Sequence, residues 1–239
     1  MEIIEQKDNK IVFKKKIEES LANALRRYIN EIPVIAIDEL EISRNDSPLY
    51  DETVAHRVGL IPLKMDKKFN AKTELNLKLK TKKEGLVYSE EIHGDVETIY
   101  KKIPITFLNK NQELEFTGIA RVGKGKEHVK FSPGLMYYRN NVDIKISKEC
   151  PKEIVEKCPK DIFEINNDKI VAKNSLKCDM CDMCVDFGTK LKKECVQINP
   201  SDELIITLES FGQMSPKDIL NNTIDFLKKD LDEVSKKLK

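Results

Sequence analysis

Tryptophan is absent from this sequence of 239 residues, and aromatic residues make up only 6% of it. A single-strand nucleic-acid binder built on stacked aromatic side chains is therefore a poor fit. Long apolar runs are also missing. No stretch approaches the roughly 20 apolar residues of a membrane span, and residues 1–10 are too polar for a signal peptide. We expect a cytoplasmic protein that makes no contact with a membrane.

An excess of charge of one sign is missing as well. The 42 basic and 41 acidic residues leave a formal net charge of +1, so no global field attracts the chain to nucleic acid. We expect no direct sequence-specific contact with DNA or RNA. His56, His93 and His128 stand far apart and form no pattern of a nucleophile with its base, so we identify no catalytic residue. Residues 123–126 (GKGK) precede a β-type stretch and not a helix, which argues against a phosphate-binding loop.

The N-terminal part of the chain predicts a strand followed by an amphipathic helix. Residues 11–16 have the pattern of a short strand. Residues 17–32 then place apolar side chains, among them Leu21, Leu25 and Tyr28, along one stripe of a helix. Such a stripe must be buried against another element or another chain.

The middle of the chain predicts mainly strands. Residues 34–43 read as a half-buried strand and residues 52–58 as a short helix. Residues 64–147 consist of short alternating runs separated by Gly, Asn and Lys turns, and residues 203–208 return to a strand pattern. The fold class is therefore α+β.

The C-terminal segment is the most regular part of the sequence. Ser215 provides a hydroxyl cap, Pro216 suits the first helical position, and Asp218 places an acid in the first turn. Apolar residues then follow a heptad seam: Leu220, Ile224, Leu227, Leu231, Val234 and Leu238. This seam either docks on the chain's own N-terminal helix or forms a subunit interface, and periodicity cannot separate the two because both bury the same face.

The cysteines are few and clustered. All six lie between Cys150 and Cys195, and in a reducing cytoplasm such clustering indicates metal or redox chemistry and not disulfides. Cys178, Cys181 and Cys184 form a C-x2-C-x2-C run, and Cys158 precedes a proline, as the fourth ligand does in bacterial ferredoxins. A hairpin expected over residues 162–171 would bring Cys158 back to this run. We expect these four cysteines to hold one iron–sulfur cluster.

Two features limit this interpretation. A full second cluster motif would need cysteines where the chain has Lys148, Pro151, Ile154 and Gly188, so we expect one cluster and not two. A structural zinc site on the same four cysteines is the alternative, because zinc also takes C-x2-C pairs. Cys150 and Cys195 lie outside the pattern and are free thiols, a redox-labile pair or ligands in another arrangement.

Several stretches together resemble the D-subunit family of archaeal DNA-directed RNA polymerase, which is related to the third subunit of eukaryotic polymerases and to bacterial alpha. The stretches are residues 21–29 (LANALRRYI), 31–37 (EIPVIAI), 51–63 (DETVAHRVGLIPL), 123–133 (GKGKEHVKFSP) and 209–216 (ESFGQMSP). They stand in the family's order and span most of the chain.

This resemblance implies a fold and a function. It implies an alpha-subunit-like dimerisation domain from residues 1–47 and 198–239, an inserted β-rich domain over 48–147, and a ferredoxin-like iron–sulfur insert over 148–197. The cluster would be 4Fe–4S, or 3Fe–4S after loss of one iron.

The implied role is that of a non-catalytic assembly subunit in transcription. The chain would pair with the small L subunit through its terminal helices, bind the small N and P subunits, and anchor the two large subunits, which carry the nucleotidyltransferase chemistry. The expected interface residues are Leu21, Leu25, Tyr28, Leu220, Ile224, Leu227, Leu231 and Val234. A ferredoxin-like electron carrier is the alternative function, motivated by the cysteine run and by Asp179 and Asp182.

Overall fold

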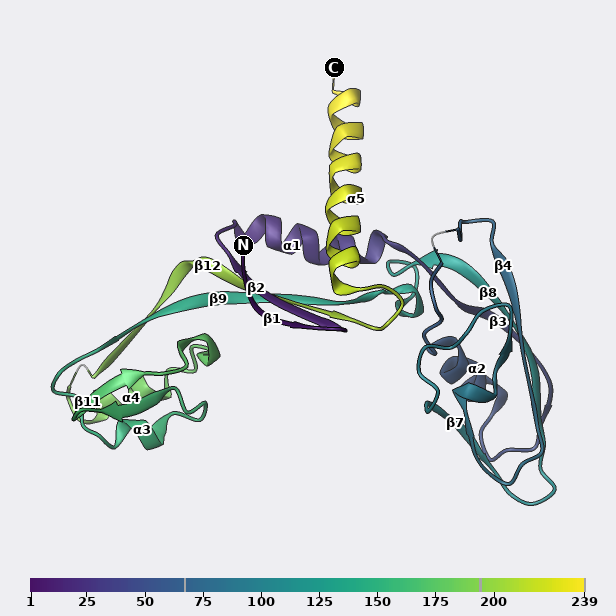
Figure 1. Cartoon of the computed structure of the whole chain (residues 1–239), viewed down its shortest axis with the longest axis horizontal. Coiled ribbons are helices and arrows are strands. Elements are labelled where there is room, and N and C mark those ends of the chain that lie inside the picture. The colour runs from purple at the N-terminus through teal and green to yellow at the C-terminus, as the bar shows by residue number, and fades with distance from the viewer. Residues whose placement is uncertain (67, 194, 239) are drawn as a thin grey trace. The chain divides into compact units, whose positions relative to one another are not determined.

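The computed structural model describes residues 1–66, 68–193 and 195–238. The chain is an α+β protein with antiparallel sheets that divides into two compact units (Figure 1). The first unit comprises Met1–Glu5, Val12–Ala22 and Tyr137–Thr207, and the second comprises Gln6–Ile11, Asn23–Met136 and Leu208–Lys239. Within the described residues, no helix combines the length and the apolar character that crossing a membrane requires.

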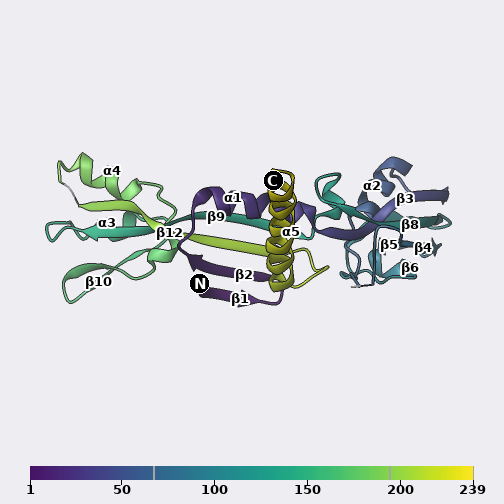
Figure 2. The ribbon, with the colours of Figure 1, turned by 90° about the horizontal axis from the view of Figure 1, so that it is seen from above.

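One sheet gathers strands from the start, the middle and the end of the chain. Its order is β1 (Glu2–Lys7), β2 (Lys10–Lys15), β12 (Val196–Ser210) and β9 (Gly134–Ile146), and the four strands lie side by side in Figures 1 and 2. Strands β2 and β12 confirm the strands expected over residues 11–16 and 203–208. Strand β1 was not expected from the sequence. It is an edge strand, and its charged residues are typical of edges protected against pairing with other chains.

The second unit contains the expected β-rich region. Strands β3 (Pro33–Asn45), β8 (Leu114–Lys124), β4 (Glu74–Thr81) and β6 (His93–Gly94) form a sheet in that order, and β5 (Gly85–Tyr88) pairs with β7 (Pro104–Leu108). Helix α2 (Asp51–Gly59) contacts β3 and β7. Alternate residues of β4 are buried, as its sequence pattern predicts. The core includes Ile35, Ile37, Val54, Val58, Leu77, Leu79 and Phe116.

The first unit contains the cysteine segment. Its elements are helix α3 (Ile154–Lys157), strands β10 (Phe163–Asn166) and β11 (Lys169–Ala172), the short turn η4 (Ser175–Lys177) and helix α4 (Met183–Lys190). Strands β10 and β11 pair as the expected hairpin. Asn167 and Asp168 form its two-residue turn with φ angles of 47° and 60°, the left-handed pair that matches the twist of a hairpin.

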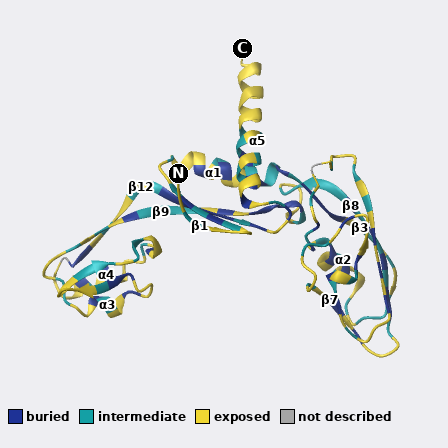
Figure 3. Cartoon of the chain, viewed as in Figure 1, coloured by how far each residue is buried: buried dark blue, intermediate teal, exposed yellow. Residues whose placement is uncertain are grey.

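The terminal helices are close to the expected ones. Helix α1 (Glu19–Tyr28) continues as a single 3-10 turn, η1 (Ile29–Glu31), before β3 begins. Helix α5 (Pro216–Lys237) starts as predicted, because the Ser215 hydroxyl accepts a hydrogen bond from the backbone N–H of Asp218 at 3.1 Å. Its first turns pack on η1, whereas its C-terminal part is exposed along most of its surface (Figure 3).

Ion pairs fasten η1 to the loop after β8. The Glu31 carboxylate lies 2.9 Å from the Lys124 ammonium and 3.0 Å from that of Lys126. Burial alone would raise the pKa of Glu31, but hydrogen bonds from the two lysines outweigh it and hold the pKa below its ordinary value. Lys124, the last residue of β8, and Lys126, in the loop after it, thus hold an internal carboxylate.

We predict that Glu31→Gln lowers the free energy of unfolding by about 1 kcal/mol at neutral pH. Because the folded-state pKa is depressed, the ion pairs contribute fully above pH 4.5, the ordinary value, and their contribution is lost as the pH falls through the folded pKa. Urea unfolding of both proteins at neutral and acidic pH measures this. The difference should shrink in acid, whereas Glu97→Gln, at an exposed pair with Lys64, should have little effect at either pH. An undiminished difference in acid would refute the assignment.

Candidate subunit interface and metal site

The four expected cluster ligands come from separate elements of the first unit. Cys158 follows α3, Cys178 follows η4, and Cys184 lies in the first turn of α4. These three thiols are buried in one apolar core, together with Ile154 and other residues. Cys181 is exposed. The fold therefore brings three of the four expected ligands into a shared core and leaves the fourth at the surface.

The cysteine run is held in a fixed turn. Arg139 of β9 donates hydrogen bonds to the carbonyl oxygens of Cys178, at 2.9 Å, and Leu176. Met180 and Asp182 both have φ angles of 56°. Residues other than glycine rarely adopt this left-handed backbone conformation. Such conformations persist where the surroundings impose them. The run thus curves back on itself before α4 begins.

The environment of the Cys178 and Cys184 thiols does not activate them as nucleophiles. Burial raises the pKa of Cys184 to about 11, and the nearby Cys158 adds to the rise. Burial likewise raises the pKa of Cys178. Because the thiolate is the reactive form, these cysteines are mostly neutral and unreactive at neutral pH in the absence of a bound metal.

The remaining two cysteines lie near the end of α4. Burial, followed by a side-chain hydrogen bond with Cys195, raises the pKa of Cys150 to about 12, so the two thiols are neighbours. Gly188 is packed against the same place, because a Cβ atom there would lie 2.8 Å from the Lys193 carbonyl oxygen and 3.0 Å from the Cβ of Cys195. A cysteine at position 188 would not fit without rearrangement. Ile154, at another position of the missing second motif, is fully buried.

The arrangement differs from a single-ion site. Across residues 1–66, 68–193 and 195–238, no three Cys, His, Asp or Glu side chains are placed to hold one metal ion. Zinc needs its four ligands around one ion, with sulfur at about 2.3 Å. A cubane cluster places each thiolate on a different iron, so its cysteines stand farther apart.

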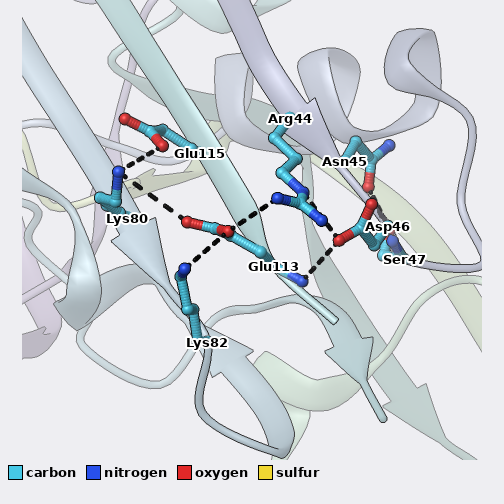
Figure 4. Close-up of polar contacts among 8 residues, drawn as sticks. All are labelled: Arg44, Asn45, Asp46, Ser47, Lys80, Lys82, Glu113 and Glu115. Atoms are coloured by element: carbon cyan, nitrogen blue, oxygen red, sulfur yellow. Dashed lines mark hydrogen bonds and ion pairs between the residues drawn. The ribbon is translucent and has the colours of Figure 1, made fainter. Parts of the chain in front are cut away.

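The buried carboxylate of the second unit is neutralised by basic residues. Glu113 is the one buried acidic residue in the described part of the chain. Lys82 lies 3.1 Å from its carboxylate, Arg44 3.3 Å and Lys80 3.8 Å (Figure 4). Its backbone N–H also donates to Asp46 at 3.1 Å. This carboxylate is held by cations of the chain itself and is not available as a ligand for catalytic magnesium.

The heptad seam of α5 is largely free. Leu220, Ile224 and Leu227 are half-buried, whereas Leu231 and Val234 are 59% and 55% exposed. The helix packs on its own chain with a neighbouring face, where Pro216, Ile219 and Thr223 are buried. The sequence pattern did not reveal that second face.

The expected interface residues of α1 differ in exposure. Leu21 is 44% exposed, Leu25 is buried and Tyr28 is half-buried. Burial raises the pKa of Tyr28, and a hydrogen bond from its hydroxyl to Asp230 of α5 adds to the rise. The end of α1 is thus linked to the side of α5.

A domain model and several whole-chain relatives among known proteins match this sequence. The RNA polymerase Rpb3/RpoA insert domain matches residues 35–137, which places the chain among the subunits that carry this domain. DNA-directed RNA polymerase subunit Rpo3 of Pyrococcus furiosus is 31% identical over 97% of this chain and 94% of its own length. Rpo3 of Archaeoglobus fulgidus is 30% identical over 99% and 96%, and RNA polymerase II subunit rpb3 of Dictyostelium discoideum is 28% identical over 98% and 93%. The chain belongs to the Rpo3 family of RNA polymerase subunits.

We predict that Arg139→Ala loosens the cysteine run. The two carbonyls lose charge-assisted hydrogen bonds, so local opening should become easier by about 1–3 kcal/mol. Hydrogen–deuterium exchange of residues 176–184 measures this. Lys173→Ala, which removes an exposed ion pair with Glu164 in the same unit, should leave the exchange unchanged. Equal protection in both variants would contradict the anchoring role of Arg139.

Proposed function

We propose that this chain is a non-catalytic assembly subunit of DNA-directed RNA polymerase and that α5 carries the surface on which the small L subunit docks. Family membership over nearly the whole chain supports the polymerase role. The polymerase itself is a nucleotidyltransferase, and its chemistry belongs to the large subunits. The observation that carries the docking surface is the seam of α5, which the chain leaves largely uncovered.

The free seam has the properties of an interface. Helix α5 has 22 residues and, at a rise of about 1.5 Å per residue, extends for about 33 Å. Its own chain buries one face near the N-terminal end, and Tyr28 also reaches the side of the helix at Asp230. Leu231, Val234 and Leu238 present apolar side chains in heptad spacing, and a second helix would bury them as in a coiled coil. The Tyr28–Asp230 hydrogen bond fixes the side of α5 next to Leu231.

The other partners follow from the family. The N and P subunits and the two large subunits would bind elsewhere on the chain, which would serve as the platform that joins them. We also place the chain in the cytoplasm, with the polymerase. The electron-carrier alternative receives no support, because the relatives that match nearly the whole chain are named as polymerase subunits.

We further propose that Cys158, Cys178, Cys181 and Cys184 bind one iron–sulfur cluster in the first unit. Three thiols in one core and a run fixed by Arg139 support the fit. The C-x2-C-x2-C run together with a Cys158 that precedes a proline favours a cluster over zinc, because zinc sites require neither feature. When bound, the cluster would supply a cross-link between α3, η4 and α4. Cys181, the exposed one of the four, would be the ligand most accessible to oxidants, so the bound cluster would be 4Fe–4S, or 3Fe–4S after oxidative loss of one iron.

The docking surface is tested by the double variant Leu231→Asp/Val234→Asp. Both side chains are more than half exposed in this chain, so the fold should survive. We expect binding of purified L subunit to weaken at least about 100-fold, because each unpaired carboxylate buried in the seam costs several kcal/mol. Isothermal titration calorimetry measures it.

A matched control separates charge from position. Lys229→Asp changes the net charge by the same two units on an exposed residue off the seam, and it should bind L as the unchanged chain does. If the double variant binds as tightly as this control, α5 is not the L-binding surface.

The cluster is tested by Cys181→Ser. We expect iron and sulfide content of the anaerobically purified chain to fall and the first unit to become less stable, because ligand binding and local folding are coupled. Cys150→Ser should keep its iron. Full iron content in Cys181→Ser would sink the assignment of this cysteine, and stoichiometric zinc in the unchanged chain would sink the cluster.

A further inference from the structure

Two cysteines of the first unit lie next to each other and are not among the proposed cluster ligands. Cys150 precedes α3 and Cys195 directly precedes β12, so residues 151–194 separate them in the sequence. Cys195 is buried in the apolar core that also holds the three buried cluster cysteines, and Cys150 packs against that core. The fold therefore brings together two thiols that the sequence keeps far apart.

Backbone hydrogen bonds hold the two cysteines in this position. The Ser147 N–H donates to the Cys195 carbonyl oxygen at 2.9 Å, and the Cys150 N–H donates to the Ser147 carbonyl oxygen at 3.3 Å. Residues 147–150 thus form a hydrogen-bonded β-turn, in which the Ser147 hydroxyl also accepts from the Glu149 N–H at 3.4 Å. The turn places Cys150 beside Cys195, and a side-chain hydrogen bond joins the two thiols.

The two thiols differ in their access to solvent and are slow to react. Cys195 is 2% exposed, whereas Cys150 is partly exposed, so a small oxidant meets Cys150 first. Burial, followed by the hydrogen bond with Cys195, raises the pKa of Cys150. Catalytic dithiols have a low thiol pKa instead. The pair therefore suits a bond that forms under sustained oxidation and not a dithiol that turns over.

A basic cleft of about 550 Å³ opens beside this turn and borders Cys195. Lys145, Lys192 and Lys193 line the cleft, and Glu149 is the one acidic residue among its described lining residues. Clefts lined mainly by one sign of charge raise the local concentration of ions of the opposite sign. An oxidant that carries carboxylates is therefore attracted to the place where the two thiols meet.

We propose that Cys150 and Cys195 form a reversible disulfide when the chain meets an anionic low-molecular-weight disulfide. Cys150 gives its proton to solvent, and its thiolate attacks one sulfur of the small molecule, which forms a mixed disulfide and releases one small thiol. Cys195 then loses its proton, attacks the Cys150 sulfur and releases the second small thiol. The protein loses two protons and two electrons, and the small disulfide takes up both.

The disulfide closes residues 150–195 into a covalent loop that contains all four proposed cluster ligands. Such a cross-link disfavours the unfolded state of the segment that it encloses. The insert then stays folded after oxidants have removed the cluster, and its ligands remain in place for a new one. In a reducing cytoplasm the pair returns to free thiols. This protective role rests on the proposed cluster, whereas formation of the disulfide does not.

The test treats the anaerobically purified full chain with oxidised glutathione, blocks the remaining thiols with iodoacetamide and maps the cysteines by peptide mass spectrometry. In the unchanged chain we expect one protein disulfide, between Cys150 and Cys195, and its complete loss on treatment with dithiothreitol. Cys195→Ala should instead retain glutathione on Cys150, because no neighbouring thiol displaces it. In Cys150→Ala the buried Cys195 should remain a free thiol. The unchanged chain decides the matter even if either variant folds poorly.

The outcomes separate this inference from the proposed cluster. Cys181→Ser, which should lack the cluster, should still form the same disulfide, so failure of the cluster alone leaves the inference standing. Glutathione that stays on Cys150 of the unchanged chain would overturn it, as would a disulfide from Cys150 to Cys184. Two free thiols in the chelator-treated chain, while exposed Cys181 takes up glutathione, would overturn it as well.

The protective role has its own measurement. In the chelator-treated chain, the disulfide should slow hydrogen–deuterium exchange of residues 154–190 by about 10-fold or more, because opening of the enclosed segment becomes less favourable. The reduced chain under the same conditions is the control. Equal exchange in the oxidised and reduced chains would overturn this role.

Discussion

The structure depends on the pairing of the chain's beginning with its end in one sheet. Strand β12 lies between β2 and β9, so a segment near residue 200 is held between one near residue 12 and one near residue 140. The segments between β2 and β9 and between β9 and β12 are therefore inserted into this frame. Pairings so distant in sequence must meet the cost of closing long loops before they contribute stability. Local structure in the inserted regions reduces this cost.

The end of β12 in this sheet also determines where α5 begins. The chain leaves β12 through a loop in which Gly212 has a φ angle of +103°, and the Ser215 cap then starts the helix. Ile219 and Thr223 then bury one side of the helix, which fixes its direction. An amphipathic helix gains most of its stability from packing and little from propensity. Beyond these first turns the apolar seam is exposed, so α5 would gain the rest of its packing stability only when another subunit covers that seam.

Much of the local structure could be predicted from the sequence because it depends on near neighbours. The Ser215 cap, the β10–β11 turn and the alternation in β4 are set by residues within a few positions. Strand β1 was missed because its charges hide any alternation, and only its place at a sheet edge explains them.

The residues that sequence reasoning missed are joined by tertiary contacts. The periodicity of α5 contains two apolar faces, and nothing in it says which one the chain covers itself. The roles of Glu113 and Glu31 depend on basic partners that are 31 to 95 residues away in sequence. The pairing of Lys124 and Lys126 with Glu31 could likewise not be predicted from the sequence. The cysteine run was visible because its three members are close in sequence.

The composition of the core gives a physical reason to propose a metal site in the first unit. Its core cluster contains nine buried residues in the described part of the chain, and four of them are cysteines: Cys158, Cys178, Cys184 and Cys195. A cysteine buries little apolar surface, so this core gains less from the hydrophobic effect than one built of leucine or phenylalanine. Inserts below about 70 residues commonly need a metal or disulfides for that reason. A cluster bonded to Cys158 and to the run would join α3 to α4 covalently and supply the cohesion that the apolar contacts lack.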